Sequence, residues 1–414
     1  MFYNTGMDAL TKLRVMSEHM DLEPAEEVTV RPTPPPSVDA KQGIAPCGQV
    51  IVPREEAAQG KHDQAVFHAK LPNGKTIPML KTLLTSACER NCHYCPFRAG
   101  RNFRRVTFKP EEMAQTFMDM YRAGMVQGLF LSSGIIGGGV KTQDKLLDTV
   151  TILRQKHRFR GYVHLKVMPG AELAQIEQAM TLADRLSVNL EAPNERWLAA
   201  LAPKKTFVEE LLRPLQQIEQ IRQEKAGQLG WNGRWPSTVT QFVVGAVGES
   251  DLELLSTAEY LHKQLHLSRV YYSTFSPISD TPLENHLAEN PLRTHRLYQA
   301  SFLFLDYQFD LEEMPFDPSG RLPLDTDPKL AWAYANLREN PVEVNRADRE
   351  ELLRVPGIGP KGAAIILAAR RRGVLREVAH LQQIGVQTKR LKPFVLLDGK
   401  RPSYQLPLFN EGIS

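Results

Sequence analysis

Three of the four cysteines in the chain, Cys88, Cys92 and Cys95, fall within eight consecutive positions. Thiolate sulfur is the protein ligand that selects iron–sulfur clusters and zinc. Three cysteines at this spacing suit a 4Fe–4S cluster with one iron left open to an outside ligand. A structural zinc site usually takes four protein ligands, and His93 lies between two cysteines where its reach is poor. A disulfide is the other alternative, although nothing marks the chain as secreted.

The pattern Cys-x3-Cys-x2-Cys, with the aromatic Tyr94 before its last cysteine, resembles the signature of the radical S-adenosylmethionine (SAM) superfamily. The resemblance implies that Cys88, Cys92 and Cys95 hold a 4Fe–4S cluster and that SAM chelates the open iron. It also implies that Tyr94 lies against the adenine. Cys47 is distant from these three in sequence, so we expect a plain thiol there rather than a fourth ligand.

Length and charge set limits on the class of protein. A chain of 414 residues is long enough for two or three domains, and its net charge of +4 does not indicate a general polyanion binder. It has no run of about eighteen apolar residues and no basic-then-apolar start, so we expect neither a membrane span nor a secretory signal. Few cysteines, clustered as ligands, predict a cytoplasmic protein.

Residues 65–335 predict an α/β domain. A hairpin with an Asn73-Gly74 turn feeds a strand over 79–85 that leads to Cys88. Further strands are expected over 128–133, 163–167, 186–190, 239–244 and 270–275. Helices are expected over 110–123, 144–156, 172–183, 208–224 and 252–264. Six parallel strands with intervening helices predict an open, partial (β/α)6 TIM-like barrel, which is also the core that the resemblance implies.

The carboxyl ends of barrel strands are where functional groups gather. The candidates there are Ser132, Ser133, Gly134, Asn189, Glu191 and Gly245. The resemblance assigns the first three to the SAM amino group, the next two to its ribose and Gly245 to its adenine. The chain departs from the family's Gly-Gly-Glu after the second strand, where it has Gly137-Gly138-Gly139. The alternative interpretations are a flexible glycine loop and solvated polar loops.

The segment that follows the cysteines interleaves arginine with phenylalanine. Its members are Arg98, Arg101, Arg104 and Arg105 with Phe97, Phe103 and Phe108. Guanidinium groups suit phosphates and aromatic rings stack on exposed bases, which predicts contact with a nucleic acid. The alternative is a basic loop that packs over the cluster.

Residues 336–400 predict a small all-α domain. A helix capped by Asn345, the turn Val355-Pro-Gly-Ile-Gly-Pro-Lys-Gly and a helix over 363–372 resemble the helix-hairpin-helix DNA-binding motif. Gly357 and Gly359 would bring backbone N–H groups close to a phosphate, and Lys361 adds charge. A degenerate second copy over 381–390 ends at Lys389 and Arg390. Residues 341–401 hold thirteen lysines and arginines against six acids, a local net charge of +7. A hairpin used only for packing is the alternative.

The two ends of the chain carry other signals. Residues 1–64 predict a helix over 7–20 and then a proline-rich linker. Residues 401–414 predict a tail in which Gln405, Leu406, Leu408 and Phe409 resemble the peptide by which bacterial replication and repair proteins bind the sliding clamp. A tail that folds back on its own domain is the alternative.

Taken together, residues 83–398 resemble a bacterial family of radical SAM proteins assigned to DNA modification or repair. The implied activity is reductive cleavage of SAM to a 5′-deoxyadenosyl radical that acts on a nucleotide in DNA, with a flavodoxin- or ferredoxin-type electron donor. A base inside a duplex is out of reach, so base flipping or a single-stranded substrate is implied. Two alternatives stay open: a radical SAM enzyme acting on RNA or tRNA, and a non-enzymatic iron–sulfur adaptor that binds DNA or the clamp.

Overall fold

A computed structural model describes residues 7–20, 66–70, 76–227 and 230–404. These residues form two compact units. The first runs up to Glu249 and includes Tyr260–Asn290, and the second combines Ser250–Glu259 with the residues from Pro291 onward. Several sequence predictions lie outside the described residues: Cys47, the proline-rich linker, the Asn73-Gly74 turn, and the clamp-like residues Gln405, Leu406, Leu408 and Phe409.

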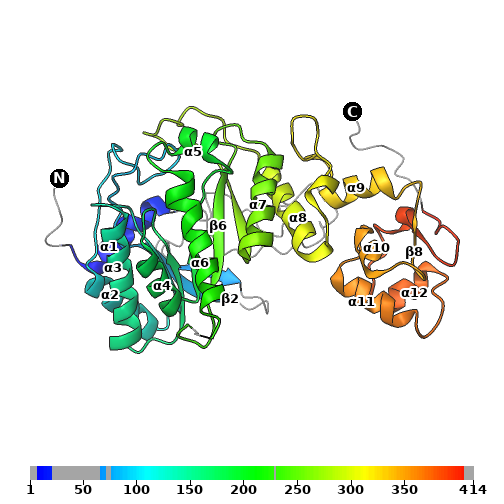
Figure 1. Cartoon of the computed structure of the whole chain (residues 1–414), viewed down its shortest axis with the longest axis horizontal. Coiled ribbons are helices and arrows are strands. Elements are labelled where there is room, and N and C mark those ends of the chain that lie inside the picture. Colours follow the sequence, from blue (N-terminus) through cyan, green and yellow to red (C-terminus); the bar gives the residue numbers. More distant parts are fainter. Residues whose placement is uncertain (1–6, 21–65, 71–75, 228–229, 405–414) are drawn as a thin grey trace. The chain divides into compact units, whose positions relative to one another are not determined.

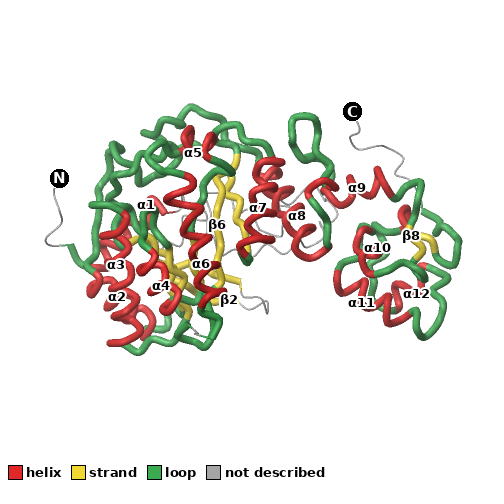
Figure 2. Tube along the Cα trace, in the orientation of Figure 1, coloured by secondary structure: helices red, strands yellow, loops and turns green. Residues whose placement is uncertain are grey.

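The first unit is built on a seven-stranded sheet whose strands follow one another in sequence order. They are β1 (Val66–Lys70), β2 (Thr76–Leu83), β3 (Gly128–Ser132), β4 (Tyr162–Lys166), β5 (Arg185–Ser187), β6 (Ser237–Val244) and β7 (Arg269–Thr274). β1 is antiparallel to β2, and every later pair is parallel. The predicted α/β fold with six parallel strands is therefore confirmed as a curled half-barrel, drawn in yellow in Figure 2.

The predicted helices are present (Figure 1), together with one helix, over 195–201, that the sequence analysis does not predict. They are α1 (Ala9–Met20), α2 (Pro110–Arg122), α3 (Gly139–Thr151), α4 (Leu173–Leu182), α5 (Glu195–Leu201), α6 (Arg213–Glu224) and α7 (Asp251–Leu265). Two π-helical segments, η2 (Ile152–Lys156) and η3 (Phe207–Leu212), continue α3 and precede α6. The start of α3 differs from the predicted residue 144, because Gly138, with φ of 92°, turns the chain directly into the helix.

The two faces of the sheet differ in polarity at β4. In β4, Val163 and Leu165 alternate with His164 and Lys166, and all four are buried. Crossover connections between parallel strands are right-handed. Because the strands of this sheet follow one another in sequence order, every crossover helix lies on the same face of the sheet. Val163 and Leu165 of β4 therefore face the helices, whereas His164 and Lys166 face the concave side of the half-barrel.

The second unit contains α8 (Pro291–Tyr307), α9 (Pro328–Asn336), α10 (Arg349–Arg354), α11 (Pro360–Ala369) and α12 (Val378–Gln383). A two-stranded ladder of β8 (Val342–Glu343) and β9 (Val395–Leu396) joins them. Its core includes Leu352, Val355, Ile366, Leu381 and Phe394. The second unit thus includes α8 and α9, which the sequence analysis places with the barrel.

The predicted N-cap at Asn345 is wrong. Asp348 caps α10 instead, in a reciprocal capping box with Glu351. The Asn345 side chain bonds both the N–H and the carbonyl of Leu375, at 2.8 and 2.9 Å. Asn345 therefore connects the two hairpins, a tertiary contact that competes with the local cap. Within the described segments, no helix is both long and apolar enough to cross a membrane.

Candidate functional site

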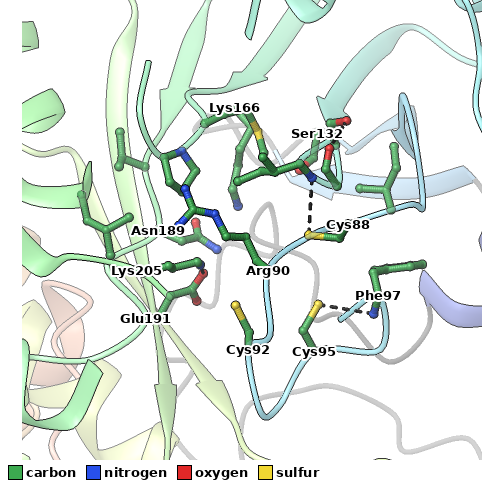
Figure 3. Close-up of a pocket in the computed structure, with 18 of the residues that line it drawn as sticks. Cys88, Arg90, Cys92, Cys95, Phe97, Ser132, Lys166, Asn189, Glu191 and Lys205 are labelled. Atoms are coloured by element: carbon green, nitrogen blue, oxygen red, sulfur yellow. Dashed lines mark hydrogen bonds and ion pairs between the residues drawn. The ribbon is translucent and has the colours of Figure 1, made fainter. Parts of the chain in front are cut away.

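The three predicted ligands line one pocket beyond the carboxyl ends of the strands, and this pocket is partly open to solvent. Cys88, Cys92 and Cys95 lie on the loop after β2, and their sulfurs point into a common space (Figure 3). Backbone N–H groups of Ile135 and Phe97 donate to the sulfurs of Cys88 and Cys95, each at 3.4 Å. Burial raises the pKa of Cys92, with the Lys205 ammonium acting in the opposite direction.

The arrangement of the sulfurs favours a cluster over the alternatives. All three cysteines are free, so none of them forms a disulfide. Among the described side chains, no three Cys, His, Asp or Glu groups lie close enough to share one metal ion. The ligands of a zinc ion all lie about 2.0–2.3 Å from the same atom, so they are close to one another. The cysteines of a 4Fe–4S cluster each bind a different iron, so their sulfurs lie further apart. Three separated sulfurs around one pocket therefore fit a 4Fe–4S cluster.

Arg90 fastens the cysteine loop to η3. Its guanidinium donates to Glu210, with Nη2 and Oε1 2.5 Å apart, and to the carbonyl of Lys204. The second oxygen of Glu210 accepts the N–H of Thr206 at 2.9 Å. The N–H of His93 also donates to the carbonyl of Leu201 at 2.8 Å. The segment between α5 and η3 is thus part of the support for the cluster loop, and sequence reasoning missed it.

Arg105 closes the same loop at its other end. Its guanidinium carbon lies 4.2 Å from the centre of the Phe103 ring. Its nitrogens donate to the carbonyls of Ser86, Phe97, Arg98 and Arg101. Arg101 likewise donates to the carbonyls of Pro96 and Ser279, at 3.0 Å each. Both guanidinium groups donate to carbonyls of the protein's own backbone. The structure therefore favours the alternative to nucleic-acid contact, which is a basic loop that packs over the cysteines.

Ser132, the last residue of β3, lines the pocket together with Ser133 and Gly134, and their contact with SAM stays a prediction. The Gly134 N–H donates to the carbonyl of Thr85 at 2.7 Å. A Cβ on Gly134 would lie 2.2 Å from the Ala87 carbonyl oxygen, so a side chain there would separate the two loops. The glycine is required by this close approach.

The triple glycine is not a free loop. The carboxylate of Glu89 accepts the N–H groups of Gly137 and Gly138 at 3.0 and 3.1 Å. A Cβ on Gly139 would lie 1.9 Å from the Pro169 carbonyl oxygen. These contacts favour an ordered segment over the flexible-loop interpretation, because Glu89 joins it to the cysteine loop.

Asn189 and Glu191, after β5, also line the pocket. Glu191 adopts a left-handed φ of 66°, held by backbone hydrogen bonds to Gln241 and Val243 of β6. Its carboxylate forms a buried ion pair with Lys205 at 3.0 Å. Burial disfavours the charged amine, yet the Cys92 and Glu191 charges raise the pKa of Lys205, which stays protonated. Lys205 is a pocket residue that sequence reasoning missed, because it follows a helix rather than a strand.

Two buried oxygens in the pocket have no hydrogen-bond partner among the described residues, Oδ1 of Asn189 and Oε2 of Glu191. An unsatisfied buried polar group costs about 1–3 kcal/mol. Burial and the Glu191 charge also raise the pKa of Tyr94, which lines the same pocket and stays a neutral phenol. The unsatisfied oxygens fit a ligand with amino and hydroxyl donors, and SAM carries both.

Gly245 does not line this pocket. It follows β6 with φ of 91°, and its N–H donates to the Glu249 carboxylate at 2.6 Å. A Cβ there would lie 2.3 Å from Oε2 of Glu289. The structure therefore gives Gly245 a local role in the turn, and its contact with adenine stays a prediction.

The residues predicted to bind DNA lie in the second unit. Gly357, with φ of 90°, turns the chain between α10 and α11, and Gly359 is the N-cap of α11. Lys361 and Lys389 are exposed, whereas Arg390 is ion-paired with Asp327. After Gly385 the second copy continues into the 3-10 segment η5 (Lys392–Phe394) rather than an α-helix. The second copy thus lacks the helix N-terminus that would face a phosphate.

The family model described as the radical SAM superfamily matches residues 82–261. No curated protein matches the sequence. Solved structures with similar folds include methylornithine synthase (PylB), 14% identical with a TM-score of 0.44, covering 55% of this chain and 61% of that one. The FeFe-hydrogenase maturase HydG from Carboxydothermus hydrogenoformans is 17% identical with a TM-score of 0.42, covering 55% and 51%. The methyltransferase TsrM from Kitasatospora setae is 11% identical with a TM-score of 0.38, covering 50% and 38%. The chain thus spans less than two thirds of each of these proteins.

Proposed function

We propose that this chain, whose residues 82–261 carry a radical SAM superfamily domain, reductively cleaves SAM and directs the resulting radical to a nucleotide in DNA. Members of the superfamily use a 4Fe–4S cluster and SAM. The observation that carries the proposal is that three free cysteines share one pocket with buried, unsatisfied oxygens of Asn189 and Glu191. The choice of DNA as the substrate is a more specific proposal, and it rests on separate observations in the second unit.

Within the pocket, Cys88, Cys92 and Cys95 would hold the cluster. When bound, the cofactors supply one-electron cleavage of the SAM sulfonium to a 5′-deoxyadenosyl radical. Asn189 offers an unsatisfied acceptor for a hydroxyl or amino group, and Lys205 offers a fixed positive charge for a carboxylate. Ser132 and Ser133 supply hydroxyls from the neighbouring strand end. Ser132, Ser133 and Asn189 are more than nine-tenths buried, which restricts the access of water to the reacting groups.

The electron must come from another protein. The whole chain has four cysteines, so too few are left to ligate a second cluster as a relay. We therefore infer a separate low-potential donor of the flavodoxin or ferredoxin type.

Support for DNA comes from the second unit. α11 begins at Gly359 without a side-chain cap, so the N–H groups of its first turn are open to an acceptor. Such a helix N-terminus favours a phosphate, and the exposed Lys361 stands in its first turn. With thirteen basic and six acidic residues, the segment 341–401 also attracts a polyanion. Contacts of this kind position a nucleic acid without reading its sequence.

The test is anaerobic turnover with a chemical reductant and SAM, with duplex DNA, single-stranded DNA or structured RNA. The proposal predicts 5′-deoxyadenosine that increases with DNA and a changed nucleoside in the digested DNA by mass spectrometry. A change confined to RNA would support the RNA alternative, and the absence of 5′-deoxyadenosine would support the adaptor. Binding of the sliding clamp by residues 405–409 is tested separately, by recovery of purified clamp with the full chain and with a chain that ends at Tyr404.

A further inference from the structure

The turn of the first hairpin is contacted by two helices that precede it in the chain. Residues 357–359 belong to this turn, which connects α10 to α11. Lys329 of α9 donates to the carbonyl of Ile358 at 2.6 Å. The hydroxyl of Tyr307, the last residue of α8, lies 3.2 Å from the place that a Cβ on Gly359 would take. Side chains of α8 and α9 therefore stand directly behind the start of α11, where the proposed function places a phosphate.

The Lys329 ammonium has no carboxylate partner among the described residues. Its Nζ lies 4.4 Å from the centre of the Tyr307 ring, and its side chain is mostly buried. Asp327 begins the same helix, but its carboxylate is ion-paired with Arg390 and accepts the N–H of Leu330 at 2.9 Å. A buried ammonium is costly unless a group of opposite charge lies beside it. The fold thus leaves the charge of Lys329 without the anion that would balance it.

The other charged groups that face Lys329 do not supply this anion. Arg354 of α10 is ion-paired with two glutamates, and Arg390 comes from the second copy. Burial lowers the pKa of Lys329 to about 7; Asp327 acts against this, and the two guanidinium groups add to it. Burial also raises the pKa of Tyr307, which stays a neutral phenol. Near pH 7 the free protein therefore holds Lys329 partly as a neutral amine.

We propose that Lys329 is a second cation of the phosphate site at the first hairpin, supplied by α9 from outside the motif. This rests on the proposed function, because the anion is a phosphodiester of DNA. A phosphate at the start of α11 would supply the counter-charge that the fold lacks. The neutral amine would then take up a proton as DNA binds, and the bond to the Ile358 carbonyl would hold the ammonium at the turn.

Proton uptake makes the affinity for DNA depend on pH. Below pH 7 the free protein already carries the ammonium, so binding has no protonation cost. Above pH 7 a growing part of the binding free energy goes into protonating Lys329. Affinity should therefore be highest below pH 7 and decrease as the pH rises through 7. Since the phosphate raises the pKa of Lys329 above its value in the free protein, binding should be about fivefold tighter at pH 6 than at pH 8.

The test measures fluorescence anisotropy of a short labelled duplex with the full chain, at pH 6 and pH 8 and constant ionic strength. Lys329→Met should lose most of the pH dependence and bind at both pH values about as wild type binds at pH 8. Lys329→Arg keeps a charge at both pH values, so it should bind at both about as wild type binds at pH 6. Two controls should keep the wild-type dependence: Lys400→Met, an exposed lysine after β9, and His380→Gln in α12.

Three results would overturn the role of Lys329. They are a wild type without pH dependence, a Lys329→Met variant with the wild-type dependence, and equal weakening of that variant at both pH values, because the lysine would then only support the turn. Denaturant unfolding at both pH values checks the fold, and wild type and Lys329→Arg decide the question if Lys329→Met does not fold. In each case duplex binding by wild type would leave the proposed DNA substrate standing, whereas no binding at either pH would reject both.

Discussion

Arg90 and Glu210 are 120 positions apart in the sequence, and their ion pair joins the cysteine loop to η3. The two side chains are 17% and 19% exposed. Arg90 lies between Cys88 and Cys92, so the ion pair connects η3 to the segment that carries the sulfurs. The pair therefore links the stability of the barrel to the geometry of the cluster site.

Breaking this pair should reduce both stability and iron loading. We expect Glu210→Ala to lower the free energy of unfolding by about 2–3 kcal/mol, because it leaves the partly buried Arg90 guanidinium without a carboxylate partner. The matched control is Arg122→Ala, which removes an ion pair with Asp119 that is 57% and 61% exposed and should change stability by less than about 1 kcal/mol. Denaturant unfolding and iron per chain measure the two effects. Full iron loading in Glu210→Ala would show that η3 does not support the loop.

Gly134→Ala tests the close approach of the loop after β3 to the cysteine loop. The added Cβ would lie 2.2 Å from the Ala87 carbonyl oxygen, which is backbone and cannot rotate away. We expect a loss of about 2–3 kcal/mol in stability, and of SAM binding, since the two loops must separate. Gly227→Ala is the control, because a Cβ there meets no atom within 4 Å. If both variants melt at the wild-type temperature and bind SAM equally, the approach is not required.

The sequence predicted the periodic elements and the groups at strand ends, and it missed contacts made by side chains distant in sequence. The six parallel strands follow from alternating apolar runs, and the cysteines follow from their spacing. Lys205 and Glu210 carry no such signal, because their roles depend on where α5 and η3 pack. Asn345 shows the same limit within a hairpin, since a tertiary contact with Leu375 replaces the local cap that its residue type predicts.

Lys329 should make the stability of the second unit depend on pH. Burial lowers its pKa to about 7, and its ammonium or amine donates to the Ile358 carbonyl at 2.6 Å. Between pH 7 and the ordinary lysine pKa, the unfolded chain binds a proton that the folded chain does not, so this residue makes stability rise with pH. Wild type should therefore gain about 2 kcal/mol over Lys329→Met between pH 7 and 9. Parallel denaturant titrations at the two pH values measure the difference. A constant difference would mean that Lys329 stays charged in the fold.

The two hairpins should contribute unequally to DNA binding. Lys361 stands at the start of α11, whereas Lys389 precedes the 3-10 segment η5, which offers no α-helical N-terminus. We expect Lys361→Ala to weaken binding of a duplex roughly fivefold near 0.1 M salt and to reduce the salt slope by about 1. Lys389→Ala should have the smaller effect, and Lys145→Ala in the first unit none. Fluorescence anisotropy over a salt series measures both the affinity and the salt slope. Equal effects at Lys361 and Lys389 would indicate that the second copy also contacts a phosphate.

Asn189→Ala should separate folding from cofactor binding. Because Oδ1 of Asn189 is buried without a partner, its removal relieves an unsatisfied group and should leave the SAM-free protein as stable as wild type, within about 1 kcal/mol. The same change should weaken SAM binding about tenfold, because the ligand loses an acceptor that no water replaces. Ser133→Ala is the contrasting variant, since its hydroxyl already donates to the Gly134 carbonyl at 2.7 Å and its loss should affect stability first. Equilibrium dialysis measures SAM binding and thermal melting measures stability, and both are done on variants with equal iron content. If Asn189→Ala binds SAM as wild type does, the unsatisfied oxygen faces a different ligand.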